Sequence, residues 1–313
     1  MISIKTGGCG MKIIDAHVHV FKNLQGFRGE GELYPIGGGK ARWANGDIVE
    51  MIPPHLGEDA FTYETCYKFL KEKDVEKAVL LQGSYYGFAN EYVAEAIKTY
   101  PDMFIGAGTY DPMSRYAEQI HERLVNELEF KILKFETSSG GGLMSYHHSY
   151  KLDEVFLPIA KKCEEQNVVM VLDIGSPGME SFQPKAVRKI AMECPKLKVV
   201  ICHLLAPTLK DHTTGVFEES MNCLKLDNVY FDLAAVPFNV QPEEYPFPTG
   251  LDYIKKAAEI VGTEHLLWGT DIPSVLIKNS YEKLTDYITE SGLFLQSDLE
   301  KMFYENAMRV YPF

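Results

Sequence analysis

Two histidines stand two residues apart in an apolar stretch near the start of the chain, Met11-Lys-Ile-Ile-Asp-Ala-His-Val-His-Val-Phe21. If this stretch is a β-strand, His17 and His19 point to the same face, because successive side chains of a strand alternate. Two imidazoles on one face can bind the same metal ion through neutral ring nitrogens. An ordinary strand with a polar end fits the spacing equally well, so the rest of the chain must decide between the two.

Three more residues that could ligate a metal or transfer protons stand at the ends of similar apolar runs. Asp173 lies in Val-Val-Met-Val-Leu-Asp, His203 ends Val-Val-Ile-Cys-His, and Asp271 ends Leu-Leu-Trp-Gly-Thr-Asp. Carboxylates and imidazoles serve as ligands of divalent metals and as general acids or bases. These side chains can act together only if the fold brings the ends of their strands to one place.

Apolar runs of this kind alternate with helical patterns along most of the chain. Each run is short and rich in Val, Ile, Leu and Phe, as parallel strands covered on both faces are. The eight predicted strands are Met11–Phe21, Val75–Leu81, Phe104–Thr109, Lys131–Phe135, Val168–Ile174, Lys198–Cys202, Val229–Leu233 and Leu266–Trp268. Apolar residues at helical spacing predict helices over Phe61–Lys71, Glu91–Tyr100, Arg115–Leu128, Leu152–Gln166, Pro184–Glu193, Val216–Leu224, Leu251–Val261 and Ser297–Tyr311.

The alternation predicts an α/β fold, a (β/α)₈ TIM barrel that forms a single domain over residues 1–313. An open doubly wound sheet would normally have fewer strands and a Gly-x-Gly-x-x-Gly motif after one of them, which this chain lacks in that position. Residues 22–59 contain eight glycines and a Pro-Pro pair, which predict a long loop insertion after the first strand. In a TIM barrel the carboxyl ends of the strands meet at one mouth, so the five candidate side chains should converge there.

These motifs together resemble the amidohydrolase superfamily, in its amidohydrolase-2 branch of metal-dependent hydrolases and decarboxylases. The resemblance rests on Ile-Asp-Ala-His-Val-His at the first strand, a histidine at the end of the sixth, Trp-Gly-Thr-Asp-Ile-Pro at the eighth and Glu-Asn-Ala-Met-Arg near the end. It extends from about Lys12 to the end of the chain. The resemblance implies that His17, His19 and Asp271 bind a divalent metal. It also implies that His203 contacts the substrate or the water on the metal.

Asp173 departs from the pattern of this family, because related enzymes usually end the fifth strand with a histidine that binds the metal. A carboxylate can also ligate, and a site of two His and two Asp would favour Mn²⁺ more than an imidazole-rich site does. Alternatively, Asp173 only accepts a hydrogen bond from a ligand. We favour direct ligation and expect one metal ion, Zn²⁺ ahead of Mn²⁺. Asp15, two residues before His17, should face the same side and orient the turn.

Several polar residues outside this set could contact the substrate. Lys134 ends the fourth strand, where it either faces the substrate or extends its stem along the core. Gly140, Gly141 and Gly142, in the loop after this strand, predict a mobile lid over the mouth. The predicted substrate-binding residues are Lys134, Tyr146, His147, His148 and His55. The last three of these could equally be solvated surface histidines.

Two reactions suit this set of residues. In hydrolysis a metal-activated water attacks, Asp271 accepts its proton and His203 steadies the oxyanion. In non-oxidative decarboxylation of an unsaturated or aromatic acid, Asp271 or His203 protonates carbon as CO₂ leaves. We favour hydrolysis of a small, carboxylated or cyclic substrate, because related hydroxybenzoate decarboxylases often replace the first histidine by glutamate and this chain keeps His17. A catalytically inactive barrel that binds a small molecule is the alternative of another class, suggested by Asp173.

Composition limits the partners and the compartment. The chain carries 31 Lys and Arg against 44 Asp and Glu, a net charge of −13, without a basic cluster, which argues against nucleic acid or an anionic membrane as a partner. The N-terminal ten residues lack the apolar core of a signal peptide, and no run reaches membrane-spanning length. The scattered cysteines predict reduced thiols in a cytoplasmic protein, at positions Cys9, Cys66, Cys163, Cys194, Cys202 and Cys223. Oligomeric state is left open, with a homodimer the commonest assembly.

Overall fold

Eight parallel strands form the centre of the structure, a computed structural model that describes residues 10–313. They lie in two sheets, of order β1-β6-β7 and β12-β11-β10-β9-β8. The strands are β1 (Ile14–Val18), β6 (Lys77–Leu80), β7 (Phe104–Gly106), β8 (Ile132–Glu136), β9 (Val169–Asp173), β10 (Val199–Ile201), β11 (Val229–Asp232) and β12 (Leu266–Leu267). All eight predicted strands and the α/β class are therefore confirmed. Cys9 and the N-terminal stretch considered for a signal peptide lie outside the described residues.

Backbone hydrogen bonds cross both gaps between the two sheets. Beyond β7, Gly108 accepts a hydrogen bond from the Lys134 N–H at 2.9 Å. On the other side, the Ala16 N–H donates to the Trp268 carbonyl at 3.1 Å. The sheets are thus joined to each other at two places, between β7 and β8 and between β1 and the segment that contains β12.

Side chains of the strands alternate between two apolar cores. On β9, Val169 and Val171 belong to one cluster, whereas Met170 and Leu172 belong to the other. The first cluster consists mainly of strand residues, and the second also contains residues of the helices, such as Phe156. Both faces of the strands are therefore buried, which is why their sequences are apolar throughout rather than alternating.

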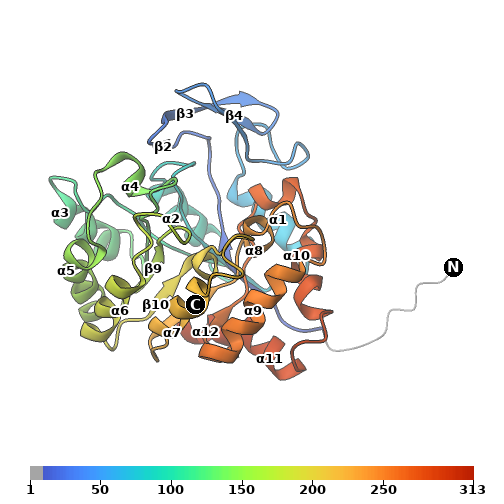
Figure 1. The fold of residues 1–313 in the computed structure, drawn as a ribbon. Helices are drawn as coiled ribbons and strands as arrows, with labels where there is room; N and C mark the ends of the chain where they lie inside the picture. Colours follow the sequence, from blue (N-terminus) through green and yellow to red (C-terminus); the bar gives the residue numbers. More distant parts are fainter. Residues whose placement is uncertain (1–9) are drawn as a thin grey trace.

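Helices follow the strands in the order that the sequence predicts, and Figure 1 shows them on the outside of the strands. Their bounds are α1 (Tyr63–Glu72), α2 (Asn90–Thr99), α3 (Ala117–Glu122), α5 (Leu152–Glu165), α6 (Pro184–Glu193), α7 (Val216–Cys223), α9 (Pro248–Val261), α10 (Tyr281–Thr289), α11 (Gln296–Glu300) and α12 (Asn306–Val310), with the short α4 (Leu143–Tyr146) and α8 (Val236–Asn239). The sequence pattern did not predict α10. Its N-cap is Ser280, whose hydroxyl accepts a hydrogen bond from the Lys283 N–H. None of the helices within residues 10–313 combines the length and apolarity needed to cross a bilayer.

Residues 22–59 are not simply the predicted loop, because they contain a four-stranded antiparallel sheet. Its strands, in the order β2-β3-β4-β5, are β2 (Phe27–Arg28), β3 (Gly31–Gly37), β4 (Lys40–Trp43) and β5 (Ile48–Glu50). Gly38 and Gly39, with φ of 62° and 73°, form the two-residue turn between β3 and β4, where positive φ is required. Leu33, Ala41 and Trp43 are buried. The glycines taken as signs of a loop are thus in part the turns of a small sheet.

The inserted sheet lies against loops that follow the carboxyl ends of parallel strands. The Gly26 N–H donates to the Tyr85 carbonyl at 3.1 Å, and the Gly29 N–H donates to Ser145 Oγ at 3.1 Å. The guanidinium of Arg28 stacks over the Trp43 ring, 4.2 Å from its centre. Figure 1 shows β2, β3 and β4 at the top of the view, at the opposite end of the molecule from α11. The insertion therefore covers the end of the molecule at which the strands finish.

Candidate metal centre

Three of the predicted ligands lie together at the end of β1. The Asp271 N–H donates to the His17 carbonyl at 2.8 Å, and the His19 N–H donates to the Ile272 carbonyl at 3.0 Å, so the two segments run side by side. One ligand atom from each of His17, His19 and Asp271 lies within 4.8 Å of the other two. Asp271 Oδ1 is 2.7 Å from His19 Nε2 and 3.5 Å from His17 Nε2. The two imidazoles and the carboxylate thus face one point.

The remaining nitrogen of each of these imidazoles is held by a buried acceptor. His19 Nδ1 lies 2.8 Å from the Leu81 carbonyl, and since a carbonyl only accepts, Nδ1 carries the hydrogen. His17 Nδ1 lies 3.0 Å from Asp232 Oδ2. In the neutral rings the lone pairs are then at Nε2, both directed at Asp271, and His17 Nε2 is buried without any hydrogen-bond partner. Lone pairs that face a carboxylate are an arrangement that a cation would complete.

The pKa shifts favour the protonation states that bind metals. Burial, together with the positive charges of His203 and Lys134, holds the pKa of His17 well below its usual value. Burial would raise the pKa of Asp271, but the contacts of its carboxylate with His19, His17 and His203 lower it to about 2. A neutral imidazole and an ionised carboxylate are the forms in which these groups ligate. The residues present therefore fit a divalent metal ion.

A bulge in β1 separates the ligands from Asp15. The register of β1 against β6 shifts between Asp15 and Val18, so the alternation of side chains is interrupted there. Ala16 lies in the core made mainly of strand residues, whereas Asp15 accepts hydrogen bonds from Thr270 Oγ1 at 2.6 Å and from the Tyr281 hydroxyl at 3.1 Å. The expectation that Asp15 faces the same side as His17 was wrong. Asp15 instead ties β1 to the segment that carries Asp271.

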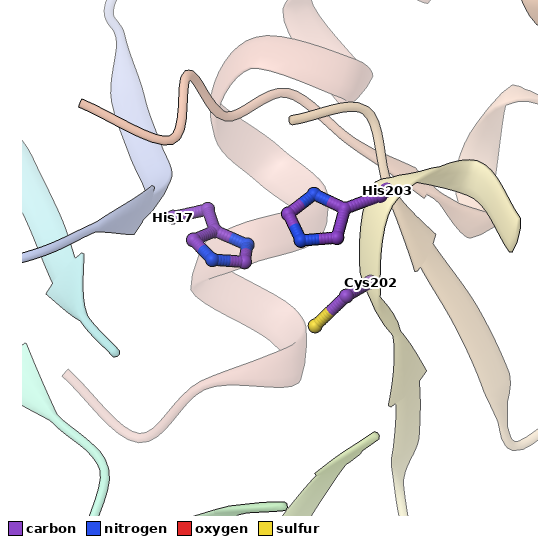
Figure 2. A group of neighbouring side chains, drawn as sticks. All are labelled: His17, Cys202 and His203. Carbon is purple, nitrogen blue, oxygen red and sulfur yellow. The ribbon is translucent and has the colours of Figure 1, made fainter. Parts of the chain in front are cut away.

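A second group of potential ligands shares His17. Figure 2 shows the rings of His17 and His203 beside each other with the thiol of Cys202 next to both, and these three residues also offer atoms within 4.8 Å of one another. The two rings stack with their centres 4.7 Å apart. Burial raises the pKa of the Cys202 thiol well above its usual value, so a metal here would first have to displace a proton. The group with Asp271 is better suited to a metal ion because its anion is already ionised.

His203 differs from His17 and His19 in its surroundings. It has a left-handed backbone, with φ of 58°, and its N–H donates to Asp232 Oδ1 at 2.8 Å. Nε2 of His203 is 3.7 Å from Asp173 Oδ2. Burial opposes a charge on the ring, but the negative charges of Asp173, Asp271 and Asp232 outweigh it and raise the pKa of His203. A protonated His203 beside a carboxylate is suited to donate a hydrogen bond or a proton.

Asp173 lies outside the group formed by His17, His19 and Asp271. Its Oδ1 accepts a hydrogen bond from the Gly175 N–H at 2.8 Å, and its Oδ2 faces His203. The side chain is buried, at 8% exposure, and lines the same cavity as His203 and Asp271. One carboxylate oxygen of Asp173 thus remains available to a ligand of that cavity.

The predicted substrate-binding residues separate into two sets. Lys134 lines the cavity of about 120 Å³ that Asp173, His203 and Asp271 also line, and Tyr146 lines a neighbouring cavity. His55 lines a separate groove beside α10, and His148 is exposed. His147 Nε2 lies 2.7 Å from Asp111 Oδ2, which ties the segment after α4 to the loop after β7. The structure therefore brings Lys134 to the candidate site, but neither cavity is lined by His55, His147 or His148.

Two carboxyl groups at this site, the buried Asp232 and the partly exposed Glu136, were not singled out from the sequence. Asp232, at the end of β11, contacts the His17 ring and the His203 N–H, and burial raises its pKa. Glu136, at the end of β8, accepts a hydrogen bond from the Ser84 N–H at 2.7 Å. Each ends a strand that the sequence predicts, and that position is the only sign in the sequence that either could contribute to the site.

Comparison with known proteins supplies the family. The sequence model of the amidohydrolase family matches residues 14–313, nearly the whole described chain. The chain belongs to this amidohydrolase-2 family. Its members include hydrolases and decarboxylases, so the family is one of enzymes. A search of curated proteins found no match.

Solved structures of several amidohydrolases resemble this chain. A protein of Acinetobacter baumannii, assigned as a 2-pyrone-4,6-dicarboxylic acid hydrolase and solved with citric acid, is 16% identical, with a TM-score of 0.67, covering 97% of this chain and 100% of its own. An amidohydrolase of Burkholderia multivorans with bound zinc is 13% identical, with a TM-score of 0.68, covering 96% and 99%. The 5-carboxyvanillate decarboxylase of Sphingomonas paucimobilis is 14% identical, with a TM-score of 0.55, covering 78% and 81%. At such low sequence identity these similarities show only that the folds are alike.

Proposed function

We propose that this amidohydrolase is a metal-dependent hydrolase that holds one divalent ion, Zn²⁺ ahead of Mn²⁺, through His17, His19 and Asp271. The observation that carries the proposal is the convergence of His17 Nε2, His19 Nε2 and Asp271 Oδ1, in which His17 Nε2 is buried without a hydrogen-bond partner. The zinc bound to the Burkholderia multivorans relative supports the choice of metal. We also infer that the eight parallel strands form one closed (β/α)₈ barrel, since hydrogen bonds join the two sheets at both places.

The protein groups in this proposal each have one task. A divalent ion, when bound, polarises a carbonyl group and acidifies water. Asp271 accepts a proton from the attacking water, which forms a bond to the carbonyl carbon. His203, whose pKa is raised by the carboxylates around it, donates a hydrogen bond to the oxygen that becomes negative. As the bond to the leaving group breaks, the proton passes from Asp271 to that group, so one water molecule is added in total.

Lys134 supports a substrate that carries a carboxylate. Its side chain is buried, at 2% exposure, and lines the cavity beside Asp271. Burial opposes its charge, but negative groups that include Glu136, Asp173 and Asp271 outweigh this effect and raise the pKa of the ammonium. A small carboxylated or cyclic compound therefore fits best, and the assignment of the Acinetobacter baumannii relative to a pyrone dicarboxylate agrees with it.

Asp173 is the proposed fourth ligand. Its Oδ2 lies in the cavity beside His203 and Asp271, while its Oδ1 is occupied by the Gly175 N–H. A single free oxygen is enough for ligation by one atom. If instead it remains beside His203, it serves to raise the pKa of that ring.

Decarboxylation is the second candidate, because the Sphingomonas paucimobilis relative of similar fold is a decarboxylase. In that reaction, the bond between CO₂ and the substrate carbon breaks, and His203 supplies the proton that replaces it. The same buried ammonium of Lys134 would hold a carboxylate of the substrate.

The experiment that tests the proposed function combines metal analysis with a reaction screen. Protein loaded with Zn²⁺ or Mn²⁺ is assayed with small carboxylated lactones in H₂¹⁸O and, separately, with unsaturated and aromatic acids. We expect about one ion per chain, uptake of one ¹⁸O into the product and loss of turnover on chelation. Release of CO₂ without ¹⁸O uptake would favour decarboxylation. Protein that keeps no metal and turns over no compound would instead be an inactive binding barrel.

A further inference from the structure

Two cavities adjoin at the carboxyl ends of the strands. The smaller one, of about 120 Å³, contains the candidate metal centre, and the larger one measures about 290 Å³. Gly83 and Glu136 line both. The closeness of Gly83 to the candidate centre is shown by a Cβ built on it, which would lie 3.8 Å from His19 Cε1 and 3.2 Å from Glu136 Oε2. The cavities therefore share a wall, and one ligand could occupy both.

The walls of the two cavities differ in chemistry. Charged groups line the smaller one, whereas aromatic and apolar side chains dominate the larger one. Phe27 and Phe88 are 55% and 54% exposed at its edge, although phenylalanine is usually buried. The Phe27 and Tyr146 rings lie edge to face, 5.4 Å between centres. Apolar lining residues of the larger cavity are Phe27, Phe88, Tyr110, Leu143 and Tyr146.

Glu136 lies where the cavities meet. It shares a strand face with Lys134, two residues before it on β8. Its carboxylate accepts a hydrogen bond from the Ser84 N–H and lies 3.3 Å from Ser84 Oγ. An ionised carboxylate can accept about four hydrogen bonds, so capacity remains for a donor on a ligand. A hydroxyl or N–H group positioned between the two cavities would be recognised there.

We propose that the larger cavity binds an apolar group of the substrate, an aryl or branched alkyl group, joined through a hydroxyl- or N–H-bearing link to the carboxyl or acyl group that reacts beside His17 and Asp271. This inference rests on the proposed function for the reacting end. The substrate is then a small amphipathic acid, amide or lactone rather than a wholly polar diacid. The volume of the larger cavity is near the lower end of ligand pockets, about 300–1,000 Å³, which suits one ring.

The experiment compares ligands that extend step by step from the smaller cavity into the larger one. Binding of acetate, phenylacetate and 3-phenylpropanoate to the zinc-loaded protein is measured by calorimetry, together with benzyl alcohol, which has no carboxylate. We expect the best aryl acid to bind at least about 10-fold more tightly than acetate, because its ring leaves water. The double variant Phe27→Ala/Phe88→Ala should lose most of that advantage and leave acetate binding unchanged. The same variant should also bind benzyl alcohol more weakly.

Leu295→Ala is the matched control, because Leu295 is 72% exposed and is the N-cap of α11, at the opposite end of the molecule from the inserted sheet (Figure 1). It should change none of the affinities. If acetate and zinc bind but the aryl acids bind no more tightly than acetate, the inference is overturned and the proposed function stands. If zinc and acetate fail to bind, the proposed function fails, and benzyl alcohol still decides the inference: binding that the double variant weakens supports it, and no binding overturns it.

Discussion

The two sides of the candidate site hold histidines whose pKa values are shifted in opposite directions. On one side, His17 is fully buried, and burial and neighbouring positive charges keep its pKa low. On the other side, the carboxylates around His203, Asp173 among them, raise its pKa. The ring planes of His17 and His203 nevertheless stack with centres only 4.7 Å apart. The difference shows that the buried charges around each ring, and not the residue type, make one imidazole a candidate ligand and the other a candidate proton donor.

Removal of the shared carboxylate should have the largest effect on this arrangement. In Asp271→Asn the two histidines lose the anion between them and the proton acceptor is gone. We expect metal content to fall to a small fraction of one ion per chain and turnover to fall by at least about 10³-fold. Plasma emission spectrometry and steady-state kinetics measure both. Asp227→Asn, an exposed carboxylate, is the control and should change neither.

Replacement of His203 should separate the two sides. His203→Asn removes the proton donor but none of the proposed ligands, so metal should stay bound while kcat falls by about 10²–10⁴. The control is His212→Asn, because the His212 ring pairs with Asp252 away from the site. This variant should keep normal turnover. Full activity in His203→Asn would remove this residue from the mechanism, and loss of metal would make it a ligand.

Asp232 connects the two sides. Its Oδ2 contacts His17 Nδ1, and its Oδ1 accepts a hydrogen bond from the backbone N–H of His203. Asp232→Asn should weaken the hold on the His17 tautomer. Carboxylates in this position typically contribute 10–100-fold to metal affinity, so we expect a loss of about that size. Competition with a chelator measures it, and excess Zn²⁺ should restore activity. An unchanged affinity would show that Asp232 only supports the fold.

Asp173→His should have the smallest effect and decides to which side Asp173 belongs. If Asp173 is a ligand, the variant exchanges a carboxylate for an imidazole, and preference should move from Mn²⁺ toward Zn²⁺. Metal competition with equal concentrations of the two ions measures the shift. The same metal content and preference as the parent would show that Asp173 acts only on His203 or on the substrate.

Much of the fold could be predicted because parallel strands covered on both faces are apolar throughout. The pattern alone located all eight strands and most of the helices, but not α4, α8 or α10. The inserted sheet escaped notice because Gly38 and Gly39 indicate a turn only when the strands on either side are recognised. The shift in β1 register, which turns Asp15 away from His17, depends on pairing with β6 and leaves no mark on the local sequence.

The site could be predicted only in part, for a related physical reason. Residues that end predicted strands, such as His17, His19 and Asp271, can be recognised one by one and placed at a common mouth. Asp232 contacts His17 across 215 positions of sequence, so its role follows from the three-dimensional fold and not from spacing. The role of His17, His19 and Asp271 as ligands stays a prediction.

We propose that one divalent ion lies between His17, His19 and Asp271. An anomalous difference map, recorded at the zinc edge from crystals of the zinc-loaded protein, tests it most directly. We expect one peak, about 2.0–2.2 Å from His17 Nε2, His19 Nε2 and an oxygen of Asp271. A peak held by Cys202 and His203 instead, or no peak in a protein that still turns over its substrate, would contradict the account.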